Sequence, residues 1–179
     1  MLCGLSIGGL FAAQSWLAGL PKIETAGLVL INTLRRDGPR LRWIGDALVR
    51  CAEVGGLEFF RDLYITLLFN EDWHDENRDK FLTPTPYTPL TKKNGHYNLL
   101  KNASSADWDL PYEQLTLPVQ VITGLQDRVF LDHHDLEHLY KRLPDARHIK
   151  FVDAAHLLPA ERPVELTETL LEFAQEVSS

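Results

Sequence analysis

Cysteine is scarce in this chain of 179 residues, and positive charge is not gathered into a patch anywhere along it. Cys3 and Cys51 are too few for a disulfide framework and too far apart for a C-x-x-C zinc site, so they predict two reduced thiols in the core. A net charge of −7 with no basic stripe indicates a protein that does not bind nucleic acid. The composition, 45% hydrophobic, suits one globular domain or part of a larger one.

Charged residues are also absent from the segment Leu2–Leu20, which raises the question of a signal peptide or a membrane span. No lysine or arginine precedes this apolar run, and the polar residues Ser6, Gln14 and Ser15 interrupt it. Because a signal peptide has a positive region before its apolar stretch, the pattern favours a buried segment of a soluble protein. We therefore expect a cytoplasmic protein without membrane contacts.

Strand and helix patterns alternate along much of the chain. Strands are expected at Met1–Cys3, Gly27–Leu34, Pro118–Gly124 and His148–Val152, and helices at Leu10–Leu20, within Leu131–Leu143 and from Pro163 onward. The apolar run of Gly27–Leu34 is continuous, as in strands that are buried on both faces. The sequence therefore predicts an α/β fold with a mostly parallel sheet flanked by helices.

One long segment interrupts this alternation. Residues 42–111 are expected to form a helical cap or lid, and residues 1–41 and 112–179 to form the α/β core. Two helices separated at Gly55 and Gly56 are expected in the first part of the cap. The prolines of "LTPTPYTPL", residues 82–90, remove hydrogen-bond donors and favour extended backbone, so no helix is expected there.

The pentapeptide "GLSIG" at residues 4–8 fits the G-x-S-x-G pattern of a nucleophilic serine. It lies between the tail of a strand and the start of a helix, where a sharp turn over residues 4–9 would present Ser6 Oγ above the sheet. Gly4 and Gly8 are both expected to be glycine because a side chain at either position would crowd the strand-to-helix crossing. The alternative is that Ser6 packs within an apolar helix. A serine hydroxyl is a poor nucleophile at neutral pH, so Ser6 would need a base.

His156 is the expected base among the histidines of the chain. It follows the strand His148–Val152 and precedes the last helix, at the edge of a parallel sheet where catalytic groups gather. His148 begins that strand and so belongs to the opposite edge. A structural histidine in a loop is the alternative interpretation of His156.

A carboxylate is expected to orient the imidazole of His156. Asp127 lies just beyond the strand Pro118–Gly124, and the 29 residues from Asp127 to His156 leave room for one helix and one strand. Asp37, which also follows a strand, is the competing acid. Asp127 could instead be a turn residue, and Asp132 is most simply the N-cap of the following helix.

Four segments together resemble the α/β-hydrolase superfamily. "GLSIGG", "GLVLINT", "LPVQVITGLQD" and "DAAHLLPAERP" are similar to its nucleophile elbow, sixth strand, acid turn and histidine loop, and they occur in the same order. The resemblance is closest to capped carboxylesterases, enol-lactonases and carbon-carbon bond hydrolases. It implies a hydrolase of small esters or lactones, with an acyl-enzyme on Ser6, the partners His156 and Asp127, an oxyanion-hole amide at Ile7, and no cofactor.

The beginning of the chain departs from that resemblance. Members of the superfamily have several strands before the elbow, whereas this chain begins three residues before Gly4. The resemblance therefore implies the C-terminal portion of a longer α/β-hydrolase, without the loop that supplies the second oxyanion-hole amide. A bared strand would favour self-association through the sheet edge. The alternative function is a catalytically inactive hydrolase-like fragment or binding module.

A second motif points to different chemistry. His134 to His138 fits H-x-x-E-H, the inverted pattern of zinc proteases, with both histidines on one helix face. No convincing further ligand follows in the sequence, so a polar helix surface is the preferred interpretation and no metal site is expected.

Overall fold

The computed structural model describes residues 1–19, 24–80, 82–129, 131–143 and 145–178. In these residues one parallel sheet is formed by β1 (Leu2–Leu5), β2 (Leu28–Ile31), β3 (Val119–Gly124) and β4 (Arg147–Phe151), in that spatial order. The strands run in one direction, so their carboxyl ends meet at one edge of the sheet. The loops that follow β1, β3 and β4 carry the predicted site residues to that edge.

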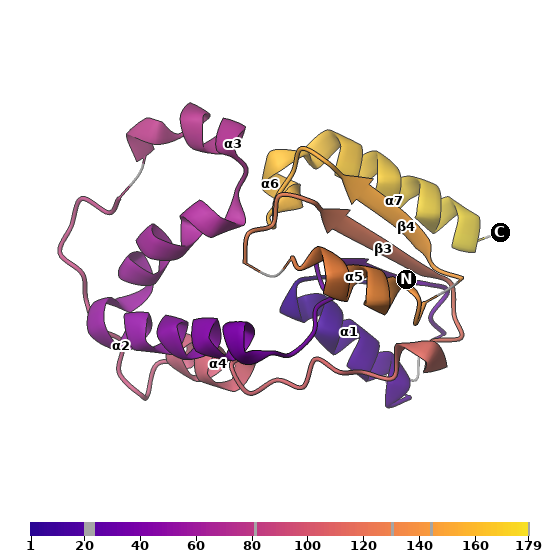
Figure 1. Cartoon of the computed structure of the whole chain (residues 1–179), viewed down its shortest axis with the longest axis horizontal. Coiled ribbons are helices and arrows are strands. Elements are labelled where there is room, and N and C mark those ends of the chain that lie inside the picture. The colour runs from indigo at the N-terminus through magenta and orange to yellow at the C-terminus, as the bar shows by residue number, and fades with distance from the viewer. Residues whose placement is uncertain (20–23, 81, 130, 144, 179) are drawn as a thin grey trace.

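Helices cover both faces of the sheet (Figure 1). Side chains alternate along β2, so that Leu28 and Leu30 face one apolar cluster while Val29 and Ile31 face the other. The first cluster includes residues of α1 (Ile7–Leu17) and α5 (His133–Tyr140), and the second includes residues of α6 (Leu158–Glu161) and α7 (Pro163–Val177). The central strands β2 and β3 are thus buried between two helical layers, as the continuous apolar run of β2 predicts.

A further group of helices lies beside the sheet, on the left of Figure 1. It contains α2 (Pro39–Leu68), α3 (Glu71–Glu76), the short helix η1 (Arg78–Lys80) and α4 (Gly95–Ala103), and the short helix η2 (Tyr112–Gln114) leads back to β3. Helix α2 is kinked at Gly56, which has φ 75°, and a Cβ at that position would overlap the carbonyl oxygen of Thr88. The expected separation of two helices at this glycine is confirmed, and residues 82–90 contain no helix, as predicted.

The bounds of several elements differ from the sequence-based expectations. Strand β1 continues to Leu5 and α1 begins at Ile7, so the turn expected over residues 4–9 is confined to Ser6. A single residue suffices because Ser6 has φ 55° and ψ −123°, which reverses the chain at once. Helix α1 ends at Leu17, and the predicted end at Leu20 lies outside the described residues.

Strand β2 is also shorter than predicted, ending at Ile31 rather than Leu34. The next residue, Asn32, has φ 46°, and this left-handed conformation ends the strand. Neither cysteine lies in the core, contrary to expectation: Cys3 is exposed and Cys51 is half-buried in α2. Cys3 is exposed because, in the described part of the chain, β1 ends the sheet and pairs with β2 alone. No helix among the described residues is long and apolar enough to cross a membrane.

Candidate active site

Ser6 occupies a strained turn between β1 and α1. Its φ of 55° is rare for a residue with a side chain, and such backbone conformations cost about 1–3 kcal/mol unless neighbouring groups hold them. The Ser6 amide donates to the carbonyl of Ile31 at 2.7 Å, and the Thr33 hydroxyl donates to the carbonyl of Ser6 at 3.1 Å. Strand β2 and the loop after it therefore hold the turn in place.

Of the two glycines in the serine motif, only Gly4 is constrained as predicted. A Cβ at Gly4 would overlap the backbone of Gly8, so the requirement for glycine at position 4 agrees with the structure. A Cβ at Gly8 itself would meet nothing within 4 Å, so that prediction was wrong. Gly9 is the second constrained position, because a Cβ there would overlap the side chain of Thr33. The serine motif predicts a close crossing but not which residue of the helix makes it.

The structure brings Asp127 and His156 together. Asp127 Oδ2 lies 2.5 Å from His156 Nδ1, and the two residues are only 5% and 4% exposed. The other carboxylate oxygen of Asp127 accepts the amide of Val129 at 3.0 Å, which fixes the carboxylate in its turn. Because an ionised carboxylate only accepts, we assign the proton to Nδ1, which leaves Nε2 able to act as a base. The competing acid Asp37 instead lies 3.9 Å from Nε of Arg42.

Asn32 ties the histidine loop to the end of β3. Its side-chain amide nitrogen donates to the carbonyls of Ala155 and His156 at 3.0 and 2.8 Å, and its side-chain oxygen accepts the amide of Gly124 at 2.7 Å. Asn32 is buried, so these bonds are shielded from water. Sequence reasoning missed this residue. The available signal was a polar side chain inside the apolar run expected to form the strand Gly27–Leu34, but asparagine is also common in turns.

The loop that carries His156 is also hydrogen-bonded to the helices beside the sheet. The amides of His156 and Leu157 both donate to the carbonyl of Leu68, the last residue of α2, at 3.0 and 3.1 Å. A carboxylate oxygen of buried Glu161 accepts the amides of Ala155 and Asn70 at 2.9 and 3.1 Å. Burial raises the pKa of the Glu161 carboxyl, while these amide bonds oppose that shift. The loop that carries His156 is therefore fixed from two sides.

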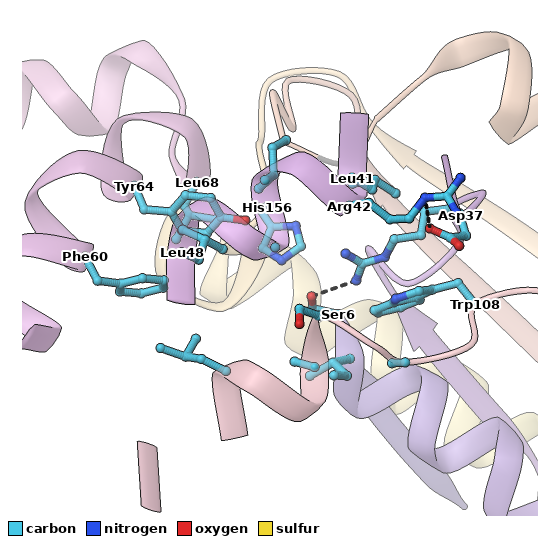
Figure 2. A pocket seen from close by; sticks show the side chains of 18 of the residues that line it. Ser6, Asp37, Leu41, Arg42, Leu48, Phe60, Tyr64, Leu68, Trp108 and His156 are labelled. Carbon is cyan, nitrogen blue, oxygen red and sulfur yellow. Dashed lines mark hydrogen bonds and ion pairs between the residues drawn. The ribbon is translucent and has the colours of Figure 1, made fainter. Parts of the chain in front are cut away.

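Ser6 and His156 line one cavity of about 320 Å³ (Figure 2). Most of its wall is apolar and comes from α2 and α4, with Leu41, Ile44, Leu48, Phe60, Leu68, Leu100 and Ala103 among the lining residues. Ile7 also lines the cavity, in the first turn of α1, where helix amides have no acceptor within the helix. A serine hydroxyl, an imidazole paired with a carboxylate, and the first amide of a helix thus lie around one apolar space.

Arg35 is an unexpected charged group in this cavity. Its Nη2 donates to Ser6 Oγ at 3.0 Å, marked by the dashed line at Ser6 in Figure 2, and its Cζ lies 3.4 Å from the ring centroid of Trp108. The residue is 4% exposed. Burial lowers the pKa of Arg35 to about 9, and the charge of Asp127 opposes this shift, so the side chain stays cationic at neutral pH. The sequence did not single out this arginine, because its neighbour Arg36 is of the same type and only the structure shows that Arg35 is buried while Arg36 is exposed.

The residues of the second motif do not form a site. His134 and His138 are exposed on α5, and in the part of the chain that the structure describes no three His, Cys, Asp or Glu side chains are grouped to hold a metal ion. Asp132 is the N-cap of α5, as predicted, and accepts the amides of His134 and Asp135 at 3.0 and 3.1 Å. This helix face is a polar surface.

No protein-family model and no curated protein sequence matches this chain. Solved structures do match it. A thermophilic esterase from Thermogutta terrifontis is 21% identical with a TM-score of 0.75, and the match covers 99% of this chain and 65% of the esterase. The enol-lactonase from Burkholderia xenovorans LB400 is 24% identical with a TM-score of 0.73, covering 97% of this chain and 64% of the enol-lactonase.

An esterase from Exiguobacterium antarcticum is 16% identical with a TM-score of 0.71, and the match covers 99% of this chain and 66% of the esterase. The chain therefore spans about 65% of the length of these structures. The likeness covers the sheet and the helices beside it. The chain has the fold of part of an α/β-hydrolase, which confirms the predicted fold class.

Proposed function

We propose that this chain carries the reacting groups of a serine hydrolase that acts on small carboxylic esters or lactones. The observation that carries the proposal is the buried 2.5 Å contact between His156 Nδ1 and Asp127 Oδ2 at the rim of the cavity that Ser6 also lines. Esterases and an enol-lactonase among the structural neighbours support the same class of reaction.

In the proposed mechanism Ser6 Oγ attacks the carbonyl carbon of the substrate while His156 Nε2 takes the hydroxyl proton. Asp127 holds the imidazole in the required tautomer and stabilises its cationic form. The bond from the carbonyl carbon to the alcohol oxygen then breaks, and the alcohol leaves with the proton from His156. Water, deprotonated by His156, attacks the acyl-enzyme, which releases the acid and restores Ser6.

The amide of Ile7 is the proposed donor to the oxyanion that forms on the carbonyl oxygen. In such intermediates the loss of one donor lowers turnover by about a hundredfold to a thousandfold. We treat residues 42–111 as a cap, because α2 and α4 supply most of the apolar wall. A cavity of about 320 Å³ is at the small end of the usual range for ligand sites, which favours small or medium acyl groups.

The test is labelling of the purified protein with a fluorophosphonate, which reacts only with an activated serine, together with hydrolysis of 4-nitrophenyl butyrate. We expect Ser6→Ala to abolish both reactions and Asp127→Asn to slow both by several orders of magnitude, because the imidazole then loses its orienting carboxylate. Ser105→Ala is the matched control, because Ser105 is exposed and does not line the cavity. Hydrolysis that survives in Ser6→Ala would refute the assignment of the nucleophile. A folded wild-type protein that neither labels nor hydrolyses would favour an inactive hydrolase-like binding module.

A further inference from the structure

The Arg35 guanidinium stacks on an aromatic ring, and one of its edges points at Ser6. Its carbon lies 3.4 Å from the centroid of the Trp108 ring, so the indole covers one face of the guanidinium. Its Nη2 lies 3.0 Å from Ser6 Oγ. A guanidinium donates hydrogen bonds only in its own plane. Because the Trp108 ring covers one face, the N–H groups of Arg35 point along that plane, toward Ser6 and the cavity that Ser6 lines.

Tyr64 adds a second donor to the same cavity. It projects from α2 into the space that Ser6 and His156 line (Figure 2), and it is 7% exposed. Among the described residues its hydroxyl has no hydrogen-bond partner. A buried hydroxyl without a partner costs about 1–3 kcal/mol, so its presence in an apolar wall points to a polar atom that arrives with the ligand. Burial raises the pKa of Tyr64 and outweighs the opposing charge of Arg35, which keeps the hydroxyl a neutral donor.

The charges around the cavity identify the kind of ligand. The arginines and carboxylates that line the cavity are Arg35, Asp37 and Arg42, and Oδ1 of Asp37 lies 3.9 Å from Nε of Arg42, so these two charges offset each other. Asp127, whose charge acts on Arg35, does not line the cavity and is bonded to His156, so buried Arg35 is the cation that faces the ligand space. One guanidinium edge and one hydroxyl match a group with one negative charge and two acceptor oxygens, and a doubly charged phosphate would call for more cations.

We propose that Arg35 and Tyr64 bind a carboxylate of the substrate, so that the preferred substrates are esters or lactones with a free carboxylate a few bonds from the scissile carbonyl. This inference rests on the proposed function of Ser6. The carbonyl carbon must come within about 3–3.5 Å of Ser6 Oγ before attack. Because Nη2 of Arg35 is itself 3.0 Å from that oxygen, a carboxylate on the arginine lies close to the reacting carbon.

Two esters of equal size separate this proposal from a general esterase. Monoethyl succinate carries a carboxylate, and ethyl 4-methylpentanoate has an isopropyl group of the same shape in its place. Ethanol release by the purified protein gives kcat/KM for each ester. We expect the wild type to favour monoethyl succinate at least tenfold, because the neutral ester leaves Arg35 and Tyr64 without a ligand acceptor.

Three variants assign that preference to the two residues. Arg35→Met should remove it, mainly through a higher KM for monoethyl succinate, and Tyr64→Phe should reduce it severalfold without loss of thermal stability, since only an unpartnered hydroxyl is removed. Arg36→Gln is the control, because Arg36 is exposed, pairs with Asp135 at 3.5 Å and does not line the cavity. It should keep the wild-type preference.

The outcomes distinguish the possible failures. A wild type that hydrolyses both esters equally overturns the carboxylate proposal and leaves the proposed function intact. Equal losses on both esters in Arg35→Met also overturn it, because Arg35 would then act on Ser6 or the oxyanion rather than on a substrate carboxylate. If the folded protein hydrolyses neither ester and does not label with a fluorophosphonate, the proposed function itself fails and this inference falls with it.

Discussion

Asn32→Asp changes one buried group without changing its shape. The aspartate oxygen that replaces the side-chain oxygen still accepts the amide of Gly124, but the nitrogen that donates to the carbonyls of Ala155 and His156 becomes a second acceptor. Aspartate tolerates the left-handed backbone of position 32 as well as asparagine does, so the variant tests the two donated bonds rather than the φ of 46°.

The expected loss of stability follows from those two bonds. A buried carbonyl left without its donor costs about 1–3 kcal/mol, so two of them give a loss of roughly 2–6 kcal/mol in the free energy of unfolding. For a chain of this size that corresponds to a fall in Tm of about 4–24 °C. Because the affected carbonyls belong to the loop that holds the imidazole, the rate of fluorophosphonate labelling at a temperature where the variant is folded should also fall.

Urea unfolding and labelling rates measure the two effects. Asn98→Asp is the matched control, since it makes the same chemical change at an exposed position of α4 and should stay within about 0.5 kcal/mol of the wild type. An Asn32→Asp protein with wild-type stability and labelling rate would refute the argument that Asn32 holds the histidine loop. Loss of stability with an unchanged labelling rate would restrict Asn32 to a structural role.

The remaining predictions concern the serine turn and the helices beside the sheet. Gly9→Ala should destabilise the protein by about 1–3 kcal/mol in urea unfolding, because the added Cβ overlaps Thr33. Gly8→Ala places its Cβ in open space and should be neutral or stabilising by up to about 1 kcal/mol. Equal effects of the two substitutions would contradict the close crossing at Gly9. Burial opposes ionisation of Asp62, but hydrogen bonds led by the amide of Thr83 outweigh it and hold the pKa of Asp62 below its usual value. Asp62 therefore contributes stability above about pH 4 that is lost as the pH falls through the lowered pKa. The difference in unfolding free energy between the wild type and Asp62→Asn should shrink from pH 6 to pH 3, and a difference that does not vary with pH would show that the carboxylate charge is not involved.

The order and type of the main elements could be predicted because they depend on local patterns. The continuous apolar run of β2, the proline at the start of α7 and the N-cap at Asp132 each have a local physical cause. Their bounds were less accurate, since single backbone conformations set them. The φ of 55° at Ser6 and of 46° at Asn32 ends β1 and β2, and neither residue type requires such a conformation.

The groups that support the site could not be predicted, because their partners are distant in the chain. Asn32 bonds to residues more than ninety positions away, and Arg35 stacks on Trp108, which is also distant in the sequence. A sequence shows that Asp127 and His156 follow strands, and parallel strands bring such residues to one edge. The sequence does not show which polar side chain will be buried and will hold the loops of Asp127 and His156 in place. Many polar residues follow strands, and most of them are exposed.

Helix α2 contributes to the wall of the cavity and also contacts the loop that carries His156. Its apolar side chains line the space around Ser6, and the carbonyl of its last residue, Leu68, accepts the amides of His156 and Leu157. The kink at Gly56 lies between the two halves of that wall, so a change of the kink angle would move the lining residues and the histidine loop together. The shape of the cavity and the placement of His156 are therefore coupled through one helix. Substitutions at the kink should for this reason change KM and kcat together, as is usual for hinge positions far from the reacting atoms.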